Sequence, residues 1–555
     1  MITETRYTQF IRASYILGLA VMLSFVAQSK IMMSISQFWL AGTFAMERFN
    51  TKRWLEFLRT NPLWKCIILV FPYSVSLFFI SIYKGLGTFI RNRPAMIFSS
   101  ILLLHFAGLF FTTDFDYAAK DIRTKLPLFL LPLFISTSSA FNRRYFYGFL
   151  LLYAASVLVR TVINTFILTG GHFVDIRQIS RPISHLIVAL HVSMVIFILG
   201  YFLMRKVTFP VVLKFLFGLC LAWFLFYLIL VRSSTGIVIT GLTILILSLV
   251  FIFRSPNFKL KISLTAFIFI FFGSTGIYIG RIIHDYYKVN PVDFSKLDQV
   301  SARGNRYFHD TASRETENGN LLYIYIQVDE MKEAWEKRSS VPYNGHDKRN
   351  QEITNTLTRF LTSKGFRKDA AGVNKLSDKE IRAIEKGVTD VVFTQRLSIR
   401  GPVYDLLAGY GRYKASGDPT GSSLMQRIEF WKASLGLIRE HWLTGVGTGD
   451  MNEAFQAEYV KMNSKLAPDQ RWRSHNQFLS IFVGFGIFGL LWFLFAILYP
   501  PIVLGKFRDY FFLVFFIIAM LSMMPEDTIE SQAGVTFFAL FYSLFLFARK
   551  EEDNI

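Results

Sequence analysis

QFLSIFVGFGIFGLLWFLFAILYPPIVL, residues 477–504, is a long apolar stretch without a single charged residue. An α-helix needs roughly 20 mostly apolar residues to cross the hydrocarbon core of a bilayer. Stretches of similar character recur along the chain, at residues 96–112, 145–168, 183–203, 215–231, 236–253 and 262–280. This repetition predicts an all-α polytopic membrane protein.

The composition of the 555-residue chain agrees with that prediction. Hydrophobic residues make up 52% and aromatic residues 17% of the sequence, and the mean hydropathy is +0.38. A soluble protein of this size has no use for so much apolar surface. Residues 15–27 are not followed by a small-residue cleavage site, so we expect this first segment to stay as an anchor. Cys66 and Cys220 lie in or beside apolar runs, which argues against a disulfide framework or a Cys-based metal site.

The net charge of +21 is distributed unevenly, and its location predicts orientation. Residues 283–474 carry a net charge of only +4, and the remainder of the chain carries +17. Most of that excess lies in alternate short connections between apolar runs, as the positive-inside rule predicts. The positive charge therefore indicates membrane orientation and not nucleic-acid binding. The basic residues of these connections are Arg143, Arg144, Arg205, Lys206, Arg254, Lys259, Lys261, Lys506, Arg508, Arg549 and Lys550.

With those connections inside, about 12 transmembrane helices divide the chain into four parts. Residues 1–282 form an N-terminal transmembrane bundle of nine or ten spans, and residues 475–548 form the C-terminal transmembrane helices. Residues 549–555 are a cytoplasmic tail. Residues 283–474 are long enough for a separate domain on the outer side, and stretches such as DEMKEAWEKR have the periodicity of helices. We therefore expect a large, mostly helical extramembrane domain between late spans.

RIEFWKASLGLIREHWLTGVGTGD, residues 427–450, is the first candidate for a functional segment. Ile428, Trp431, Leu435 and Ile438 recur at helical spacing and predict a helix that starts near Arg427 and ends before the glycines. An arginine in the first turn, beside free backbone amides, favours an anion. GVGTGD fits neither the P-loop nor the dinucleotide fingerprint, and we interpret it as a structural turn rather than a phosphate cradle.

Two further candidates, Arg232 and His475, are expected at the outer membrane interface. Arg232 interrupts the apolar run in YLILVRSSTGIVITG, residues 227–241. It can anchor the chain at the headgroups, or it can bind a phosphate bidentately. His475 follows Arg471 and Arg473 and stands at the start of the apolar stretch 477–504. His475 can be a helix cap or a surface residue without a catalytic role. Alternatively, it can accept a proton near neutral pH.

No motif of the sequence resembles a metal site, because paired histidines and carboxylates at ligand spacing are missing. We expect no cofactor.

RIEFWKASLGLIREHWLTGVGTGD, followed by RSHNQFLSIFVGFGIFGLL, resembles the O-antigen ligase family of bacterial envelope glycosyltransferases. VRSSTGIVITGLTILIL is similar to the family's SRxG-type hairpin, and MPEDTIESQAGVTFF resembles a motif between its last two spans. The resemblance covers roughly residues 90–555 and is most specific over 423–490. It implies a GT-C-like fold in the bacterial inner membrane, with an active site and the 283–474 domain in the periplasm.

The resemblance also implies roles for the candidate residues. The family transfers a glycan from a polyprenyl-diphosphate carrier, here to a lipid A-core acceptor. Arg232 and Arg427 would bind the donor diphosphate together with Arg473, and His475 would act as the base at the acceptor hydroxyl. Two guanidinium groups can stabilise the charge that builds on the leaving diphosphate, so no metal ion is expected, and the attack inverts the anomeric carbon.

The residues alone leave three other functions open. An O-antigen polymerase and a protein O-oligosaccharyltransferase share the donor chemistry with the ligase. A transporter of lipid-linked sugars is less favoured. Arg160 and His105 lie within apolar runs as a transporter's charges do, but the sequence has no visible repeat.

Overall fold

The computed structural model describes residues 4–170, 179–204, 209–395 and 398–549, which are mostly helical. They form two compact units that are described separately here. Unit 1 contains residues up to 251 and from 426 onward, and unit 2 contains residues 252–425. Within the described ranges the only sheet is an antiparallel pair in unit 2, β1 (Thr316–Glu317) with β2 (Asn320–Leu321).

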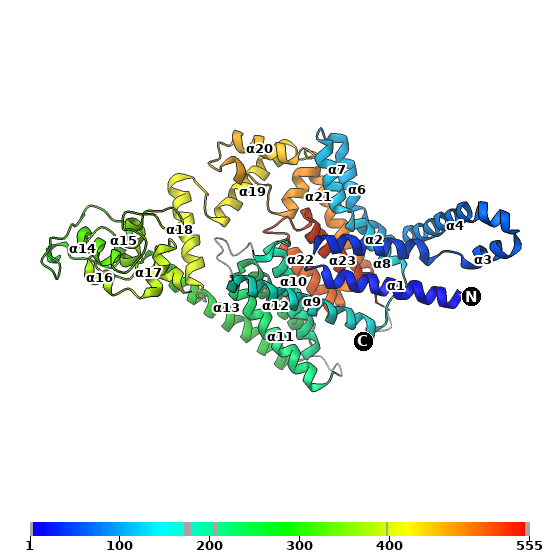
Figure 1. The fold of residues 1–555 in the computed structure, drawn as a ribbon, viewed down its shortest axis with the longest axis horizontal. Helices are drawn as coiled ribbons and strands as arrows, with labels where there is room; N and C mark the ends of the chain where they lie inside the picture. The colour runs from blue at the N-terminus through cyan, green and yellow to red at the C-terminus, as the bar shows by residue number, and fades with distance from the viewer. Residues whose placement is uncertain (1–3, 171–178, 205–208, 396–397, 550–555) are drawn as a thin grey trace. The chain divides into compact units, whose positions relative to one another are not determined.

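The first part of unit 1 is a series of helices (Figure 1). They are α1 (Glu4–Phe25), α2 (Lys30–Glu47), α3 (Thr51–Thr60), α4 (Leu63–Arg91), α5 (Arg93–Ser99), α6 (Ile101–Ala107), η1 (Gly108–Phe111), α7 (Phe115–Lys125), α8 (Pro127–Thr137), α9 (Arg143–Gly170), α10 (His185–Met204), α11 (Val211–Leu230) and α12 (Ser234–Arg254), whose end passes into unit 2. The second part contains α19 (Ser423–Glu440), which begins in unit 2, then α20 (Met451–Lys461), η5 (Pro468–Gln470), α21 (Gln477–Val503), η6 (Lys506–Arg508), α22 (Tyr510–Ser522), η7 (Thr528–Glu530) and α23 (Gln532–Phe547).

The helical membrane architecture expected from the sequence is present. Among the described residues, nine helical segments are long and apolar enough to cross a membrane. They are α1, α4, α5 to η1, α9, α10, α11, α12, α13 (Phe258–Tyr287) and α21. The expected number was about 12, and α22 and α23 are two further apolar helices that are shorter, with 13 and 16 residues.

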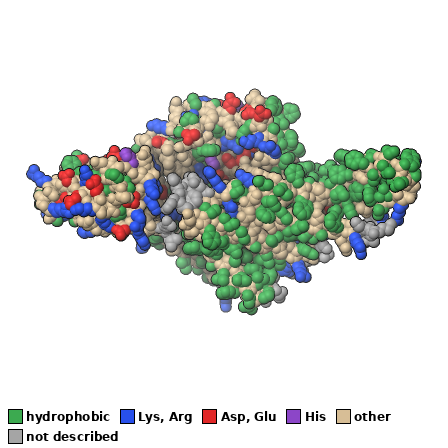
Figure 2. Space-filling view, viewed as in Figure 1, with side chains coloured by type: hydrophobic (Ala, Val, Ile, Leu, Met, Phe, Trp, Pro, Cys, Tyr) green, Lys and Arg blue, Asp and Glu red, His purple; other side chains and the backbone are tan. Residues whose placement is uncertain are grey.

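Large apolar side chains are exposed along several of these helices. Phe71 on α4, Val211 on α11 and Phe269 on α13 are 76%, 83% and 75% exposed. Figure 2 shows apolar side chains over α4 and α11, and charged ones over α14 to α17. Helices that present so much apolar surface need a lipid environment or partner protein to cover it.

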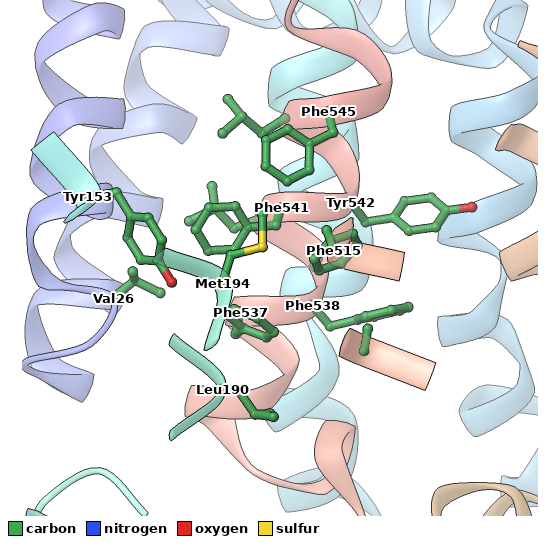
Figure 3. Packing of buried hydrophobic residues seen from close by; sticks show 14 of the residues in the cluster. Val26, Tyr153, Leu190, Met194, Phe515, Phe537, Phe538, Phe541, Tyr542 and Phe545 are labelled. Atoms are coloured by element: carbon green, nitrogen blue, oxygen red, sulfur yellow. The ribbon is translucent and has the colours of Figure 1, made fainter. Parts of the chain in front are cut away.

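Aromatic packing around α23 forms the core of unit 1. Phe537, Phe541 and Phe545 lie one turn apart on α23, and each is buried (Figure 3). They contact Phe515 of α22, and Phe541 also contacts Tyr153 of α9. A helix that is apolar on all sides belongs in the interior of a bundle, and α10 beside this core is another example.

Unit 2 has its own small core. Its elements are α13, η3 (Phe294–Lys296), β1, β2, α14 (Val328–Glu336), α15 (Ile353–Ser363), α16 (Ala370–Asn374), α17 (Asp378–Glu385), η4 (Val391–Thr394) and α18 (Arg400–Ser416). Trp335, Leu357, Phe360, Ile381 and Ile384 are fully or almost fully buried together. The large, mostly helical periplasmic domain expected over residues 283–474 stays a prediction.

The boundary between the units divides the 283–474 segment at residue 425. Phe430 and Leu437 of α19 are buried with Phe455 and Tyr459 of α20 and with Val483 of α21. Residues 426–474 therefore pack with the C-terminal helices, because the apolar faces of α19 and α20 are buried against the start of α21. At the other boundary, α13 belongs to unit 2, where Ile282 packs with Tyr404 of α18.

Candidate active site

A break in α21 shapes the region around the candidate residues. Gly486 has φ 63° and ψ −166°, which interrupts the helix in the middle of its apolar sequence. The GVGTGD turn fills the break: Val446 N donates to Val483 O at 2.9 Å, and Gly447 N donates to Gly484 O at 3.0 Å. In return, Ile487 N donates to Trp442 O at 2.8 Å.

The glycines of GVGTGD are required by this close approach. Gly445 has φ 73°, and a Cβ atom there would lie 2.3 Å from the carbonyl carbon of Gly484. The amides of Thr448 and Gly449 donate to Gly108 O and to Thr112 Oγ1. These backbone amides serve the fold and do not cradle a phosphate, as the sequence interpretation expected.

His475 lies immediately before the start of α21 and does not cap it. The N-cap is Asn476, whose side chain accepts from the amides of Phe478 and Leu479 at 3.0 and 3.1 Å. His475 itself has φ 44°, which is uncommon for a non-glycine residue. Its backbone N–H donates to Asp527 Oδ2 at 3.1 Å, and its ring stacks on Phe430. The capping alternative is therefore wrong, and the strained backbone presents the imidazole to the α22–α23 connection.

Glu526, in the connection between α22 and α23, joins two of the candidate residues. Its Oε2 lies 2.8 Å from His475 Nδ1, and its Oε1 accepts from Arg427 Nη2 at 2.9 Å. Arg427 Nε also donates to Pro525 O at 3.0 Å. A carboxylate that binds Nδ1 selects the tautomer in which Nε2 can accept a proton.

The helix that carries Arg427 differs from the prediction in its start. α19 begins at Ser423, so Arg427 lies in the second turn and not in the first. The Ser422 hydroxyl, just before the helix, accepts from Met425 N. Arg427 is therefore aimed by Glu526 and Pro525, and the free amides of a helix end do not contribute to its site.

Electrostatic contacts shift the pKa values of this group in opposite directions. Burial lowers the pKa of His475, but the hydrogen bond to Glu526 and the negative charges of Glu526 and Asp527 outweigh burial and raise it above its ordinary value. Burial would raise the pKa of Glu526, but His475 and Arg427 bring it below its ordinary value. Burial raises the pKa of Asp527. The Glu526 carboxylate therefore stabilises the imidazolium form of His475.

A cavity of about 680 Å³ in unit 1 opens beside this pair. His475, Glu526 and Arg473 line it, and Trp472 and Tyr117 are also part of its wall. Burial lowers the pKa of Arg473, but the charge of Glu530, whose Oε2 lies 3.5 Å from Nη1, outweighs burial and raises it further. Leu186 and Ile187 in the first turn of α10, and Ser184 just before it, also line the cavity.

Arg232 is the one predicted site residue that the structure does not bring into this group. Its side chain is exposed at the α11–α12 turn, and its φ is 52°. It does not line the cavity. The turn lies near the cavity wall through α10, because Gly236 packs closely against Ala189.

Sequence reasoning did not assign Glu526, Asp527 or Glu530 to the site. The signal was available, since MPEDTIE places three carboxylates in the short connection between two apolar helices. Buried carboxylates beside a membrane are costly unless they are paired, so their presence indicates partners. Within the residues that the structure describes, no group of three or more His, Cys, Asp or Glu side chains is arranged to hold a metal ion.

Comparison with known proteins bears on the same segment. Residues 382–494 match the family model described as O-antigen ligase, and this range contains Arg427, Arg473 and His475. No curated protein matches the chain. The match confirms the resemblance over these residues and indicates ligase-like or polymerase-like glycosyltransferase chemistry in a multi-pass membrane protein. Residues 382–494 are therefore similar to the O-antigen ligase family.

Proposed function

We propose that the protein is an O-antigen ligase of the bacterial inner membrane. It transfers a glycan from a polyprenyl-diphosphate carrier to a hydroxyl group of a lipid A-core acceptor, on the periplasmic side. The observation that carries this proposal is the contact of His475 and Arg427 with one carboxylate, Glu526, at a cavity that Arg473 also lines. A base and two guanidinium groups on one site are the groups that this transfer requires.

The arginines supply the positive charge for the donor diphosphate. Arg473 lines the cavity, and Arg427 is held beside it by Glu526. Guanidinium groups bind phosphate oxygens bidentately, and their attraction grows as negative charge develops on the departing diphosphate. Arg232 joins them when a donor is bound, from the turn beside α10. With this charge supply, transfer proceeds without a divalent cation.

His475 acts as the general base. Its Nδ1–H donates to Glu526, so Nε2 takes the proton of the acceptor hydroxyl. The hydroxyl oxygen forms a bond to the anomeric carbon while the bond from that carbon to the diphosphate oxygen breaks, and the diphosphate leaves with the electron pair. Attack from the face opposite the leaving group inverts the anomeric carbon. Glu526 stabilises the imidazolium that forms.

The position of the site along the helices supports a periplasmic location. His475 precedes α21, and Glu526 lies between α22 and α23. The basic residues Lys506 and Arg508 lie beyond the other end of α21, where the positive-inside rule places the cytoplasm. Both reactants are lipids whose reactive groups project at the membrane surface, and the site lies at such a surface in this arrangement.

The lipopolysaccharide of a deletion strain tests the proposed acceptor. A ligase deletion leaves intact core without polymer and accumulates long glycan on the lipid carrier. Core that carries a single repeat would instead identify a polymerase, and unchanged lipopolysaccharide with loss of glycoproteins would identify a protein O-oligosaccharyltransferase. Complementation with the intact gene and with His475→Ala separates loss of this chemistry from secondary effects.

A further inference from the structure

Behind the cavity, four side chains form a chain of alternating charges: Asp121, Lys125, Glu530 and Arg473. Lys125 Nζ contacts Asp121 Oδ1 one turn earlier on α7 and lies 2.8 Å from Glu530 Oε2. The same Glu530 oxygen lies 3.5 Å from Arg473 Nη1. Of these four residues, Arg473 and Glu530 line the cavity, and Lys125 is fully buried behind them.

The chain of alternating charges is closed at its inner end. His105 Nδ1 lies 2.9 Å from Asp121 Oδ2, and both side chains are at most 7% exposed. Buried charges are tolerated when each has a partner of opposite sign, and the four groups together are neutral. The negative charge of Glu530 is thus shared between a cation behind it and a cation in front of it.

Glu530 is also fixed within its own connection. Gln477 Nε2 donates to Glu530 Oε1 at 3.0 Å, and Gln477 Oε1 accepts from Ile529 N at 2.9 Å. The carboxylate therefore cannot turn away from Arg473 if Lys125 is lost. Burial alone would raise the pKa of Glu530, but the positive charge of Lys125, together with that of Arg473, brings it below its ordinary value.

We propose that Lys125 is a positioning residue for the diphosphate: it neutralises Glu530 from behind, so that Arg473 keeps its charge for the anionic group in the cavity. This inference rests on the proposed function. Without Lys125, Glu530 and Asp121 carry two negative charges against the single positive charge of Arg473, so the group has a net charge of −1. The two carboxylates then offset the charge of Arg473 and repel a diphosphate.

The test is a binding measurement on the full-length protein in lipid nanodiscs. The probe is geranylgeranyl diphosphate, and geranylgeraniol is the uncharged control ligand. Lys125→Met is expected to raise the dissociation constant of the diphosphate about tenfold, the order of magnitude for one unit charge roughly 12 Å away at an effective dielectric constant of roughly 20. Binding of geranylgeraniol should not change. The matched control is Lys120→Met, the same substitution at an exposed position on α7.

A second pair of variants separates charge balance from packing. Lys125→Met/Glu530→Gln restores neutrality and is expected to bring diphosphate binding back to within about threefold of the wild type. Glu530→Gln alone removes a negative charge behind Arg473 and should not weaken binding, which provides a test if Lys125→Met does not accumulate. A double variant as weak as Lys125→Met, weakened binding in Glu530→Gln, or unchanged binding in Lys125→Met would each overturn the inference.

Binding by the wild-type protein separates failure of the proposed function from failure of the role of Lys125. If it binds geranylgeranyl diphosphate no better than geranylgeraniol, the proposed function fails and the role of Lys125 fails with it. If it binds the diphosphate and Lys125→Met binds it equally well, only the role of Lys125 is overturned.

Discussion

Replacement of Glu526 by glutamine exchanges one carboxylate oxygen for an amide NH2 group. It tests the contacts of Glu526 with His475 and Arg427 in the proposed site. The glutamine has nearly the same shape, but it carries no charge and its amide can donate to His475 Nδ1. The ring would then be held with its proton on Nε2, which is the wrong tautomer for a base. Arg427 would also lose the carboxylate that it contacts at 2.9 Å.

The expected loss follows from the contacts of Glu526. It makes one charge-assisted contact to His475 and one to Arg427, and hydrogen bonds to charged groups contribute about 1.5–3 kcal/mol each. The contact to His475 strengthens when the imidazole takes a proton in the transition state. We therefore expect Glu526→Gln to raise the activation barrier by about 2–4 kcal/mol, which corresponds to a decrease of roughly 30- to 1,000-fold in kcat.

The assay is transfer of glycan from a purified polyprenyl-diphosphate donor to lipid A-core acceptor in nanodiscs, with kcat and the donor KM measured separately. The donor KM should change less than kcat, because Arg473 keeps its own partner, Glu530. Glu526→Asp keeps the charge and is the matched variant, expected to retain more activity than Glu526→Gln. A Glu526→Gln protein with kcat within threefold of the wild type would refute the pairing of His475 with Glu526 as a catalytic unit.

Four further predictions follow from the same contacts. Because the pKa of His475 is raised above the ordinary value of 6.5, its base form appears only at higher pH, and the rate should rise with pH with a midpoint above 6.5. Glu526→Gln should move that midpoint to lower pH. A pH profile of kcat/KM checks both expectations. Arg473→Lys keeps the charge but loses the planar fork, so the donor KM should increase about tenfold or more, and an unchanged KM would remove Arg473 from the donor site. Gly445→Ala should destabilise the protein by about 2–4 kcal/mol because its Cβ would collide with Gly484, whereas Gly42→Ala, in open space, should leave the melting temperature unchanged. Transfer should continue in excess EDTA; activity that disappears and returns with Mg²⁺ or Mn²⁺ would contradict the metal-free mechanism.

The helical bundle could be predicted from the sequence because the apolar interior of a bilayer requires helices. In a bilayer every backbone polar group has to be bonded within the segment, and a long apolar run therefore becomes a helix. The apolar stretches around residues 145–168, 183–203 and 236–253 are the helices α9, α10 and α12. Periodicity indicated the helix α19 but does not identify its buried face: Leu435, one of the residues that recur at helical spacing, is 48% exposed, and Ala433 and Leu437 are buried.

The candidate site was only partly accessible to sequence reasoning, because its residues are brought together from three separate segments. His475 and Arg473 could be noticed beside an apolar run, and Arg427 at the start of a helix. Glu526, the common partner of His475 and Arg427, lies 99 residues from Arg427 in the chain, and nothing local in the sequence connects them. The apolar periodicity also did not place the start of α19, which begins at Ser423, four residues before Arg427.

The sequence by itself determined that this chain is a helical membrane protein with a segment similar to the O-antigen ligase family, because hydropathy and local motifs are properties of contiguous residues. Tertiary structure alone decided which charges meet. Lys125 contacts Glu530 across 405 positions, and Asn476, not His475, caps α21. The physical reason is that a buried charge must find an opposite charge wherever the fold places one, and that distance in space is not encoded by distance along the chain.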